Sequence, residues 1–207
     1  MNITSIVVHG ARAVAKIMFD TQDAATFHQE VAVMYQLHAC VNISRLLGYV
    51  ENPKTIVLKY YPLGSLEGFV RKGIQGFPYT YKVVFNLAHG IASGLFSMHR
   101  RMLAHSDIKS ANVLLEQVNG PRGPMLRAIL TDFGICKVLS PQLRVKHFTV
   151  DNVQGVSLLY ASPEVLRAMH KDGTIVSDPK VVWGGVIYAW AMVVYEMLTR
   201  VPPWFYT

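Results

Sequence analysis

The residues of this chain that could do chemistry together lie in two short segments. Positions 105–112 read His-Ser-Asp-Ile-Lys-Ser-Ala-Asn, and Asp132-Phe133-Gly134 follows further along the chain. An aspartate, a lysine and an asparagine in one short loop can converge on a single phosphoryl group, and a second aspartate after an apolar strand can complete a metal clamp. This combination predicts a site that moves a phosphoryl group from ATP to a hydroxyl.

Three further segments occur around this loop in a fixed order. Ala13-Val14-Ala15-Lys16-Ile17 and Phe27-His28-Gln29-Glu30-Val31 precede the loop, and Ser162-Pro163-Glu164 follows it. With the two segments above, they resemble the ordered motifs of a eukaryotic protein kinase catalytic domain, of the serine/threonine type and the tyrosine-kinase-like branch. The match runs in register from about Ala13 to the C-terminus.

The resemblance implies an α+β, two-lobed fold. We expect one protein kinase domain over residues 1–207, with a small β-rich N-lobe that carries one helix at residues 1–60 and a mainly helical C-lobe at residues 61–207. Both lobes are expected to be incomplete, so the domain would be truncated at both ends. Apolar surface on the central helix of the C-lobe should then be uncovered.

The resemblance also assigns roles to the polar residues of the loop. Asp107 is expected to orient the substrate hydroxyl and accept its proton late in the transfer. Lys109 would neutralise charge that develops on the γ-phosphate. Asn112 and Asp132 offer the hard oxygen ligands that Mg²⁺ prefers.

Nucleotide contacts are expected from the N-lobe and from the turn that follows it. Lys16 lies on a strand that otherwise reads apolar and is costly to bury unless paired, so Glu30 and phosphate oxygens are its expected partners. Leu58 falls at the family's gatekeeper position. The hinge backbone expected to bond adenine comprises Lys59, Tyr60 and Tyr61.

Four residues are expected to pack rather than react. Met34, Leu46, His105 and Phe133 occupy positions that in kinases stack into an apolar spine between the lobes. His105 is therefore interpreted as a packed structural histidine and not as a general base.

Four features depart from the family's pattern. Only a short segment precedes Lys16, so the glycine-rich loop that covers the phosphates is missing, and His9-Gly10 is no substitute. Ser106 replaces an arginine that pairs with a phosphorylated activation segment in many kinases. Val186 replaces an aspartate that hydrogen-bonds the catalytic loop, which predicts a looser loop, and the chain stops at Pro203-Trp204-Phe205, where a C-lobe normally continues.

Two functions therefore stay open. The first is a protein kinase that uses ATP and Mg²⁺ to phosphorylate a serine or threonine of a protein substrate. The alternative is a catalytically weak or inactive pseudokinase, or truncated kinase, that binds nucleotide or protein. The choice of serine or threonine over tyrosine depends mainly on Lys109, and Val156, where such kinases often carry a threonine, weakens it.

Composition agrees with a globular intracellular protein. The chain is 51% hydrophobic and 16% charged, which is typical of a folded domain. Cys40 and Cys136 have no metal-type spacing, and no cationic segment precedes an apolar stretch at the N-terminus, so we expect a cytoplasmic protein. The net charge of +7 comes from dispersed residues without aromatic interleaving, so nucleic acid is not the expected partner.

Periodicity and turn residues predict the elements that position the site. Strands are expected at 6–8, 12–18, 46–51 and 55–60, with a helix from about Asp23 to Leu37. Apolar spacing predicts a helix over 81–99 directly before the loop, and residues 119–124 read as a turn-rich insert between two short strands. The uncharged run from Val181 to Tyr195 is shorter than the roughly 20 residues a bilayer needs, so we interpret it as a core helix and expect no membrane span.

Overall fold

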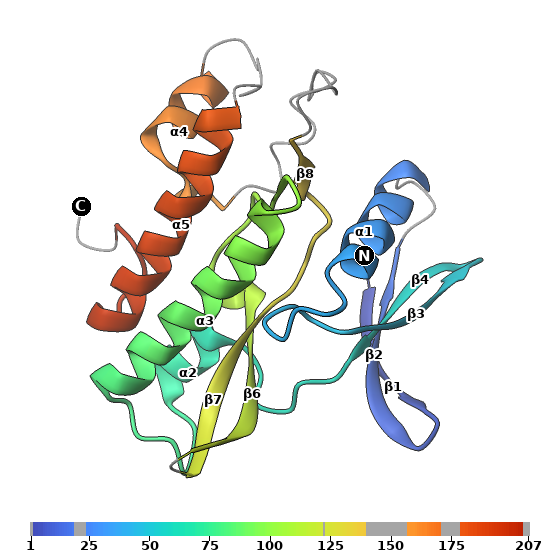
Figure 1. Cartoon of the computed structure of the whole chain (residues 1–207), viewed down its shortest axis with the longest axis horizontal. Helices are drawn as coiled ribbons and strands as arrows, with labels where there is room; N and C mark the ends of the chain where they lie inside the picture. Colours follow the sequence, from blue (N-terminus) through green and yellow to red (C-terminus); the bar gives the residue numbers. More distant parts are fainter. Residues whose placement is uncertain (1, 19–23, 122, 140–156, 171–178, 205–207) are drawn as a thin grey trace.

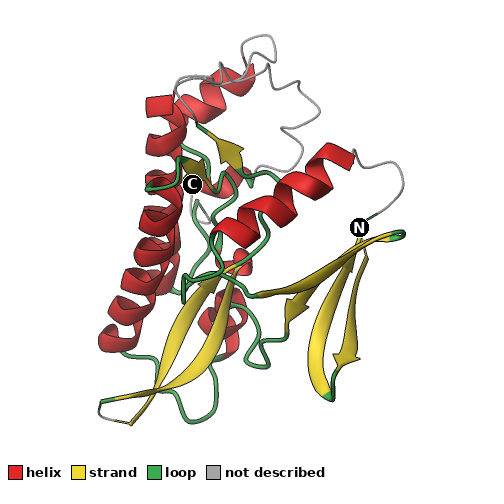
Figure 2. Ribbon diagram, turned by 45° about the vertical axis from the view of Figure 1, so that its right-hand side comes forward, coloured by secondary structure: helices red, strands yellow, loops and turns green. Residues whose placement is uncertain are grey.

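The computed structural model describes residues 2–18, 24–121, 123–139, 157–170 and 179–204. One part of the molecule is an antiparallel four-stranded sheet with the strand order β1-β2-β4-β3, and the helices α2 to α5 belong to a second part (Figure 1). The strands of the sheet are β1 (Asn2–Val8), β2 (Ala11–Ile17), β3 (Leu46–Glu51) and β4 (Lys54–Lys59). One helix, α1 (Ala24–Gln36), belongs to this part and lies beside β3 (Figure 2). The expected two-lobed α+β arrangement is confirmed.

The sheet is built from two hairpins. β1 pairs with β2 along their whole length, and the turn between them uses His9 and Gly10, both with positive φ (48° and 77°). Two successive residues with positive φ match the right-handed twist of a hairpin. β1 is longer than the sequence predicted, because residues 2–5 carry no apolar alternation yet pair with the inner strand β2.

The second part of the molecule is organised around two long helices that run side by side (Figure 1). α3 (Tyr81–His99) begins where Thr80 accepts a hydrogen bond from the Val83 N–H, and its buried residues recur every three or four positions. α5 (Pro179–Thr199) buries a matching stripe, and the Trp190 indole N–H donates to the Ala88 carbonyl across the pair (3.1 Å). This amphipathic spacing predicts α3 from sequence, and the observed bounds agree.

A long hairpin fills the space beside α3. β6 (Val113–Gly120) pairs with β7 (Gly123–Leu130) through eight consecutive residue pairs, and β7 packs on α3. Gly94 on α3 allows this contact, since a Cβ there would lie 2.9 Å from Leu130 Cδ1. The expected turn-rich insert at 119–124 is wrong in extent: both strands continue into it, because cross-strand pairing as far as Gly120 and Gly123 satisfies the backbone.

Shorter elements connect these parts. They are α2 (Leu66–Lys72), β5 (Leu103–Ala104), the 3₁₀ turn η1 (Ser110–Asn112), β8 (Lys137–Val138), the 3₁₀ turn η3 (Leu158–Tyr160) and α4 (Pro163–His170). β5 pairs with β8, which holds the segment after Asp132 against the start of the catalytic loop. One continuous hydrophobic cluster joins the two parts of the molecule, running from Phe27 and Met34 to Phe133 and Val193.

α5 is the one described helix long and apolar enough to cross a membrane by length and composition. The helix has 21 residues, which is long enough to span a bilayer. The argument that the uncharged run from Val181 to Tyr195 is too short to span one therefore does not hold. The buried helix of a globular protein meets the same criterion. In α5, 33% of the candidate span is buried, and the polar Glu196 is buried within the fold and bonded to Ser110 and Tyr160. The expected uncovered apolar surface is present, since Ile187 and Leu198 are about half exposed.

Candidate active site

A buried lysine meets two carboxylates at the boundary between the sheet and the helical part. Lys16 on β2 points toward α1, where its Nζ lies 2.6 Å from Glu30 Oε1 and 2.9 Å from Asp132 Oδ1. Lys16 and Glu30 are both buried, and Asp132 is 41% exposed at its side chain. The Lys16–Glu30 contact predicted from the sequence is therefore present, and Asp132 joins it from a segment distant in sequence.

The electrostatics of this cluster favour the charged forms of Lys16 and Asp132 but not that of Glu30. Burial by itself would lower the pKa of Lys16, but the Glu30 and Asp132 carboxylates outweigh burial and raise that pKa. Burial likewise opposes ionisation of Asp132, and Lys16 holds the pKa of Asp132 below its ordinary value, with His105 and Lys109 acting in the same direction. Burial raises the pKa of Glu30, so its carboxylate depends on Lys16 for compensation.

The catalytic loop gathers three of the predicted residues around one carboxylate. Lys109 Nζ lies 2.8 Å from Asp107 Oδ2, and the Asn112 amide donates to the same oxygen (2.7 Å) and to the Asp107 carbonyl (2.9 Å). Because the amide nitrogen of Asn112 is used in this way, its carbonyl oxygen is the atom left to act as a ligand.

A fourth residue enters this group that the sequence analysis did not assign. The Ser157 hydroxyl donates to Asp107 Oδ1 (2.9 Å) and accepts from Lys109 Nζ (2.9 Å). The sequence analysis noted a valine, Val156, where such kinases often carry a threonine, and Val156 lies outside the described residues. The hydroxyl that contacts Asp107 and Lys109 belongs to the next residue, Ser157. Ser157 could have been found from the sequence by counting back from the Ser162-Pro163-Glu164 motif and allowing a shift of one residue.

The loop owes its position to buried contacts on both sides. His105 is fully buried, its ring lies 5.1 Å from that of Phe133, and its Nε2 is 3.0 Å from the Thr131 carbonyl oxygen. This confirms packing as the role of His105, and burial lowers its pKa. Asp132 adopts a positive φ of 66°, which an aspartate tolerates better than most residues and which turns its carboxylate toward Lys16.

A second buried carboxylate anchors the other end of the loop. Glu196 on α5 accepts hydrogen bonds from Ser110 Oγ (3.0 Å) and from Tyr160 OH (2.7 Å). Val186 is buried in the apolar stripe of α5 and, as a valine, offers no side-chain hydrogen bond to the loop. Glu196 therefore joins the loop, the segment around Tyr160 and α5. Sequence reasoning did not single out this carboxylate, although a glutamate within an apolar helix is a signal for it.

The hinge residues lie where the two parts of the molecule join. Leu58 is half-buried at the end of β4, and Tyr60 lies under the Arg12 guanidinium (4.1 Å to the ring centroid). The Lys59 N–H donates to the Arg45 carbonyl (3.0 Å) and the Tyr61 carbonyl accepts from the Gly64 N–H (3.2 Å). These two groups are engaged within the protein, so an adenine would have to meet the remaining backbone groups of the hinge.

The site as a whole presents the donor set of a phosphoryl-transfer centre. Asp132 and Asn112 carry side-chain oxygens of the kind that Mg²⁺ prefers, and Lys16 is a buried cation whose Nζ contacts two carboxylates. The described residues contain no cluster of three or more His, Cys, Asp or Glu that could hold a metal. A metal here would therefore need phosphate and water oxygens to complete its coordination, which is usual for Mg²⁺ bound with a nucleotide.

Comparison with known proteins identifies the family. The model of the protein kinase domain matches residues 8–207, so the chain belongs to the protein kinase family. Among its relatives is a probable serine/threonine-protein kinase, roco6, of Dictyostelium discoideum, which is 30% identical over an alignment of 184 residues; the alignment covers 86% of this chain and 8% of that protein.

Other relatives show a similar level of identity. U-box domain-containing protein 70 of Oryza sativa subsp. japonica is 28% identical over 88% of this chain and 21% of its own length. The probable serine/threonine-protein kinase pats1 of Dictyostelium discoideum is 27% identical over 84% of this chain and 5% of its own length. The chain spans no more than 27% of the length of the curated relatives that it matches here.

Proposed function

We propose that this protein transfers the γ-phosphoryl group of ATP to a serine or threonine hydroxyl of a protein substrate. The observation that carries the proposal is a hydroxyl already held between the two groups that such a reaction needs. Ser157 Oγ lies 2.9 Å from Asp107 Oδ1 and 2.9 Å from Lys109 Nζ. A pocket that fixes an alcohol in this way has the polarity required to fix a substrate alcohol.

The roles follow from the charges. Asp107 holds the attacking hydroxyl and accepts its proton, while Lys109 stabilises negative charge that develops during transfer. Lys16, fixed by Glu30, binds phosphate oxygens of the nucleotide, and Asn112 with Asp132 holds Mg²⁺. Bound Mg²⁺ would supply neutralisation of the phosphate charge.

A second candidate function is nucleotide or protein binding without transfer. Val186 favours it, because this buried valine cannot hydrogen-bond the catalytic loop, and so does Ser106, which cannot make the ion pair of an arginine with a phosphorylated activation segment. Most of that segment, residues 140–156, lies outside the described residues. If the protein is active, we propose that it acts without phosphorylation of this segment, and phosphatase treatment should leave its activity intact.

Binding and transfer are tested separately. At 100 times its dissociation constant, MgATP should stabilise a binding-competent protein by about 2.7 kcal/mol, measured as a shift in thermal unfolding. Asp132→Asn should remove the part of this shift that depends on Mg²⁺. If the wild-type protein shows no shift in thermal unfolding with MgATP, the proposal that nucleotide binds at this site is wrong.

Transfer is then measured with radiolabelled ATP and peptides that carry serine, threonine or tyrosine as the only acceptor. Asp107→Ala and Lys16→Ala should abolish labelling, and Lys82→Ala, which removes an exposed lysine of α3, is the matched control. Ser157→Ala should lower the rate and Ser157→Thr should retain it. Labelling that survives both active-site changes would exclude the assigned roles, and labelling of tyrosine alone would exclude the serine/threonine assignment.

A further inference from the structure

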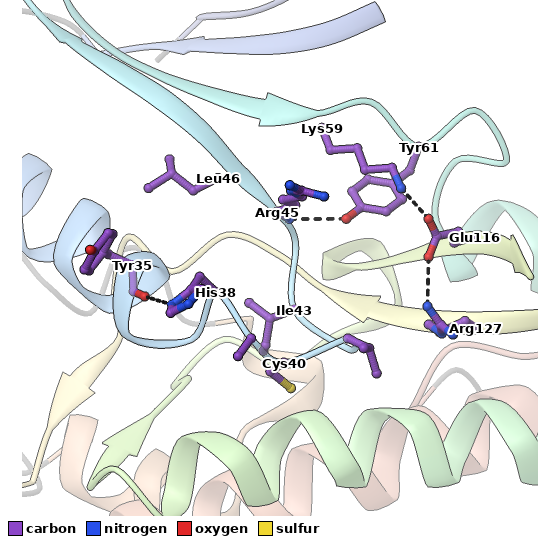
Figure 3. Close-up of a pocket in the computed structure, with 12 residues that line it drawn as sticks. Tyr35, His38, Cys40, Ile43, Arg45, Leu46, Lys59, Tyr61, Glu116 and Arg127 are labelled. Carbon is purple, nitrogen blue, oxygen red and sulfur yellow. Dashed lines mark hydrogen bonds and ion pairs between the residues drawn. The ribbon is translucent and has the colours of Figure 1, made fainter. Parts of the chain in front are cut away.

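A cavity of about 420 Å³ lies beside the hinge, between the two parts of the molecule (Figure 3). Its walls come from the segment that follows α1, from the ends of β3 and β4 and from the β6–β7 hairpin. It shares only Lys59 and Tyr61 with the residues assigned to ATP. Its volume falls in the range of about 300–1,000 Å³ found for small-molecule sites.

One side of the cavity carries an excess of positive charge. The cations Arg45, Lys59 and Arg127 line it together with a single carboxylate, Glu116. That carboxylate is already shared, since Oε1 lies 2.5 Å from Lys59 Nζ and Oε2 lies 3.4 Å from Arg127 Nη1. Within the part of the chain that the structure describes, no carboxylate pairs with the Arg45 guanidinium. An oxyanion would supply the missing negative charge.

A phenol adds a neutral donor to the same side. Tyr61 OH accepts a hydrogen bond from the backbone N–H of Arg45 (3.2 Å), and burial raises the pKa of this phenol. The hydroxyl therefore keeps its hydrogen at neutral pH and can donate it to a ligand oxygen.

The other side of the cavity is lined by apolar side chains together with His38, which lies beside Tyr35. Ile43, Leu46 and Tyr35 line it with Cys40, and Figure 3 shows Leu46 and Tyr35 on the side away from Glu116 and Arg127. A ligand that fits both sides carries charge at one end and an apolar body at the other. A few placed polar groups combined with apolar contact area are what small-molecule sites use for orientation and affinity.

We propose that this cavity is a second binding site, which takes a small organic anion. A carboxylate or phosphate head would lie against Arg45, Arg127 and Tyr61, and an aromatic or aliphatic body would lie against Ile43 and Leu46. The proposal does not depend on phosphoryl transfer, so it stands or fails separately from the proposed function.

Binding is measured on the full chain by ¹⁹F NMR with three probes of one shape. The probes are 4-(trifluoromethyl)benzoate, 4-(trifluoromethyl)phenyl phosphate and the neutral 4-(trifluoromethyl)benzamide. At least one anion should bind about tenfold more tightly than the amide, a difference of roughly 1.4 kcal/mol. Binding of the benzoate alone would identify a carboxylate site, and binding of the phosphate alone a phosphate site. Equal binding of all three probes, or no binding of either anion, would overturn the proposal.

Charge reversal at Arg45 tests where the anion binds. Arg45 is exposed, so Arg45→Glu should fold normally, and it should weaken the anions about tenfold or more while leaving the amide unchanged. Lys82→Glu makes the same change of charge on the exposed face of α3, outside the cavity, and should leave every affinity within about twofold. Equal affinity of the anion for wild type and Arg45→Glu would refute the site.

Cys40 gives an independent readout from inside the cavity. Its thiolate displaces iodide from iodoacetate, an anion, or from iodoacetamide, which is neutral. The preference for iodoacetate should fall in Arg45→Glu, and a saturating anionic probe should slow alkylation of Cys40. Cys136 is 1% exposed and should stay unlabelled. Alkylation of Cys40 at an unchanged rate in the presence of bound probe would place the probe elsewhere and refute the proposal.

Discussion

Glu196 joins three segments of the candidate active site. Its substitution should destabilise the fold, and the effect should depend on whether its partner Tyr160 is present. Its carboxylate is 2% exposed and accepts two hydrogen bonds, from Ser110 Oγ at 3.0 Å and Tyr160 OH at 2.7 Å. Hydrogen bonds to a charged group contribute about 1.5–3 kcal/mol each. Burial raises the pKa of Tyr160, so its phenol is protonated at neutral pH and can donate to Glu196.

Two substitutions separate charge from shape. Glu196→Gln keeps the side-chain volume and one acceptor oxygen but loses the charge, so we expect a loss of about 1–2 kcal/mol in the free energy of unfolding. Glu196→Ala removes both bonds and leaves a small cavity, and we expect a loss of about 3 kcal/mol. The loss of unfolding free energy in Glu196→Ala stays moderate because Ser110 Oγ and Tyr160 OH lie 3.3 Å apart and can form a hydrogen bond with each other.

A double-mutant cycle then measures the coupling directly. Glu196→Gln, Tyr160→Phe and the double variant are unfolded in urea and followed by tryptophan fluorescence. The interaction energy between the two positions should be about 1–2 kcal/mol. Losses that add to within about 0.5 kcal/mol, or a Glu196→Gln variant as stable as wild type, would refute the view that this carboxylate anchors the catalytic loop.

Two further predictions concern packing and thiol chemistry. Gly94→Ala should lower the free energy of unfolding in urea by about 1–3 kcal/mol, because its Cβ would meet Leu130 at 2.9 Å. Gly184→Ala, on α5 with nothing within 4 Å of the added Cβ, should instead raise that free energy by about 0.5–1 kcal/mol. Equal effects of the two substitutions would contradict the packing argument. Burial raises the pKa of the Cys136 thiol to about 12, so its alkylation in the native state should stay negligible from pH 7 to pH 9, whereas denaturant should expose it. Mass spectrometry that finds native Cys136 labelled as fast as Cys40 would show that this segment opens.

Much of the fold follows from local patterns that tertiary contacts do not override. The apolar spacing along 81–99 sets α3, and the Thr80 cap fixes its start. The elements that sequence reasoning misjudged are those whose ends depend on pairing. β1 extends to Asn2 because β2 offers seven partners, and the β6–β7 strands run into a segment rich in glycine and proline because each is the partner of the other.

The sequence by itself determined which groups are present and in what order: a lysine on a strand, a glutamate on the following helix, and the Asp107, Lys109, Asn112 and Asp132 set. These identities are readable because each type has a distinct charge or donor pattern at fixed spacing. Only the tertiary structure decided that Ser157 lies on Asp107, that Glu196 holds the loop, and that Arg45, Lys59 and Arg127 line one cavity. The physical reason is that these contacts join residues far apart in the chain, and their distances are set by how β-hairpins and helices pack rather than by any local preference of the residues.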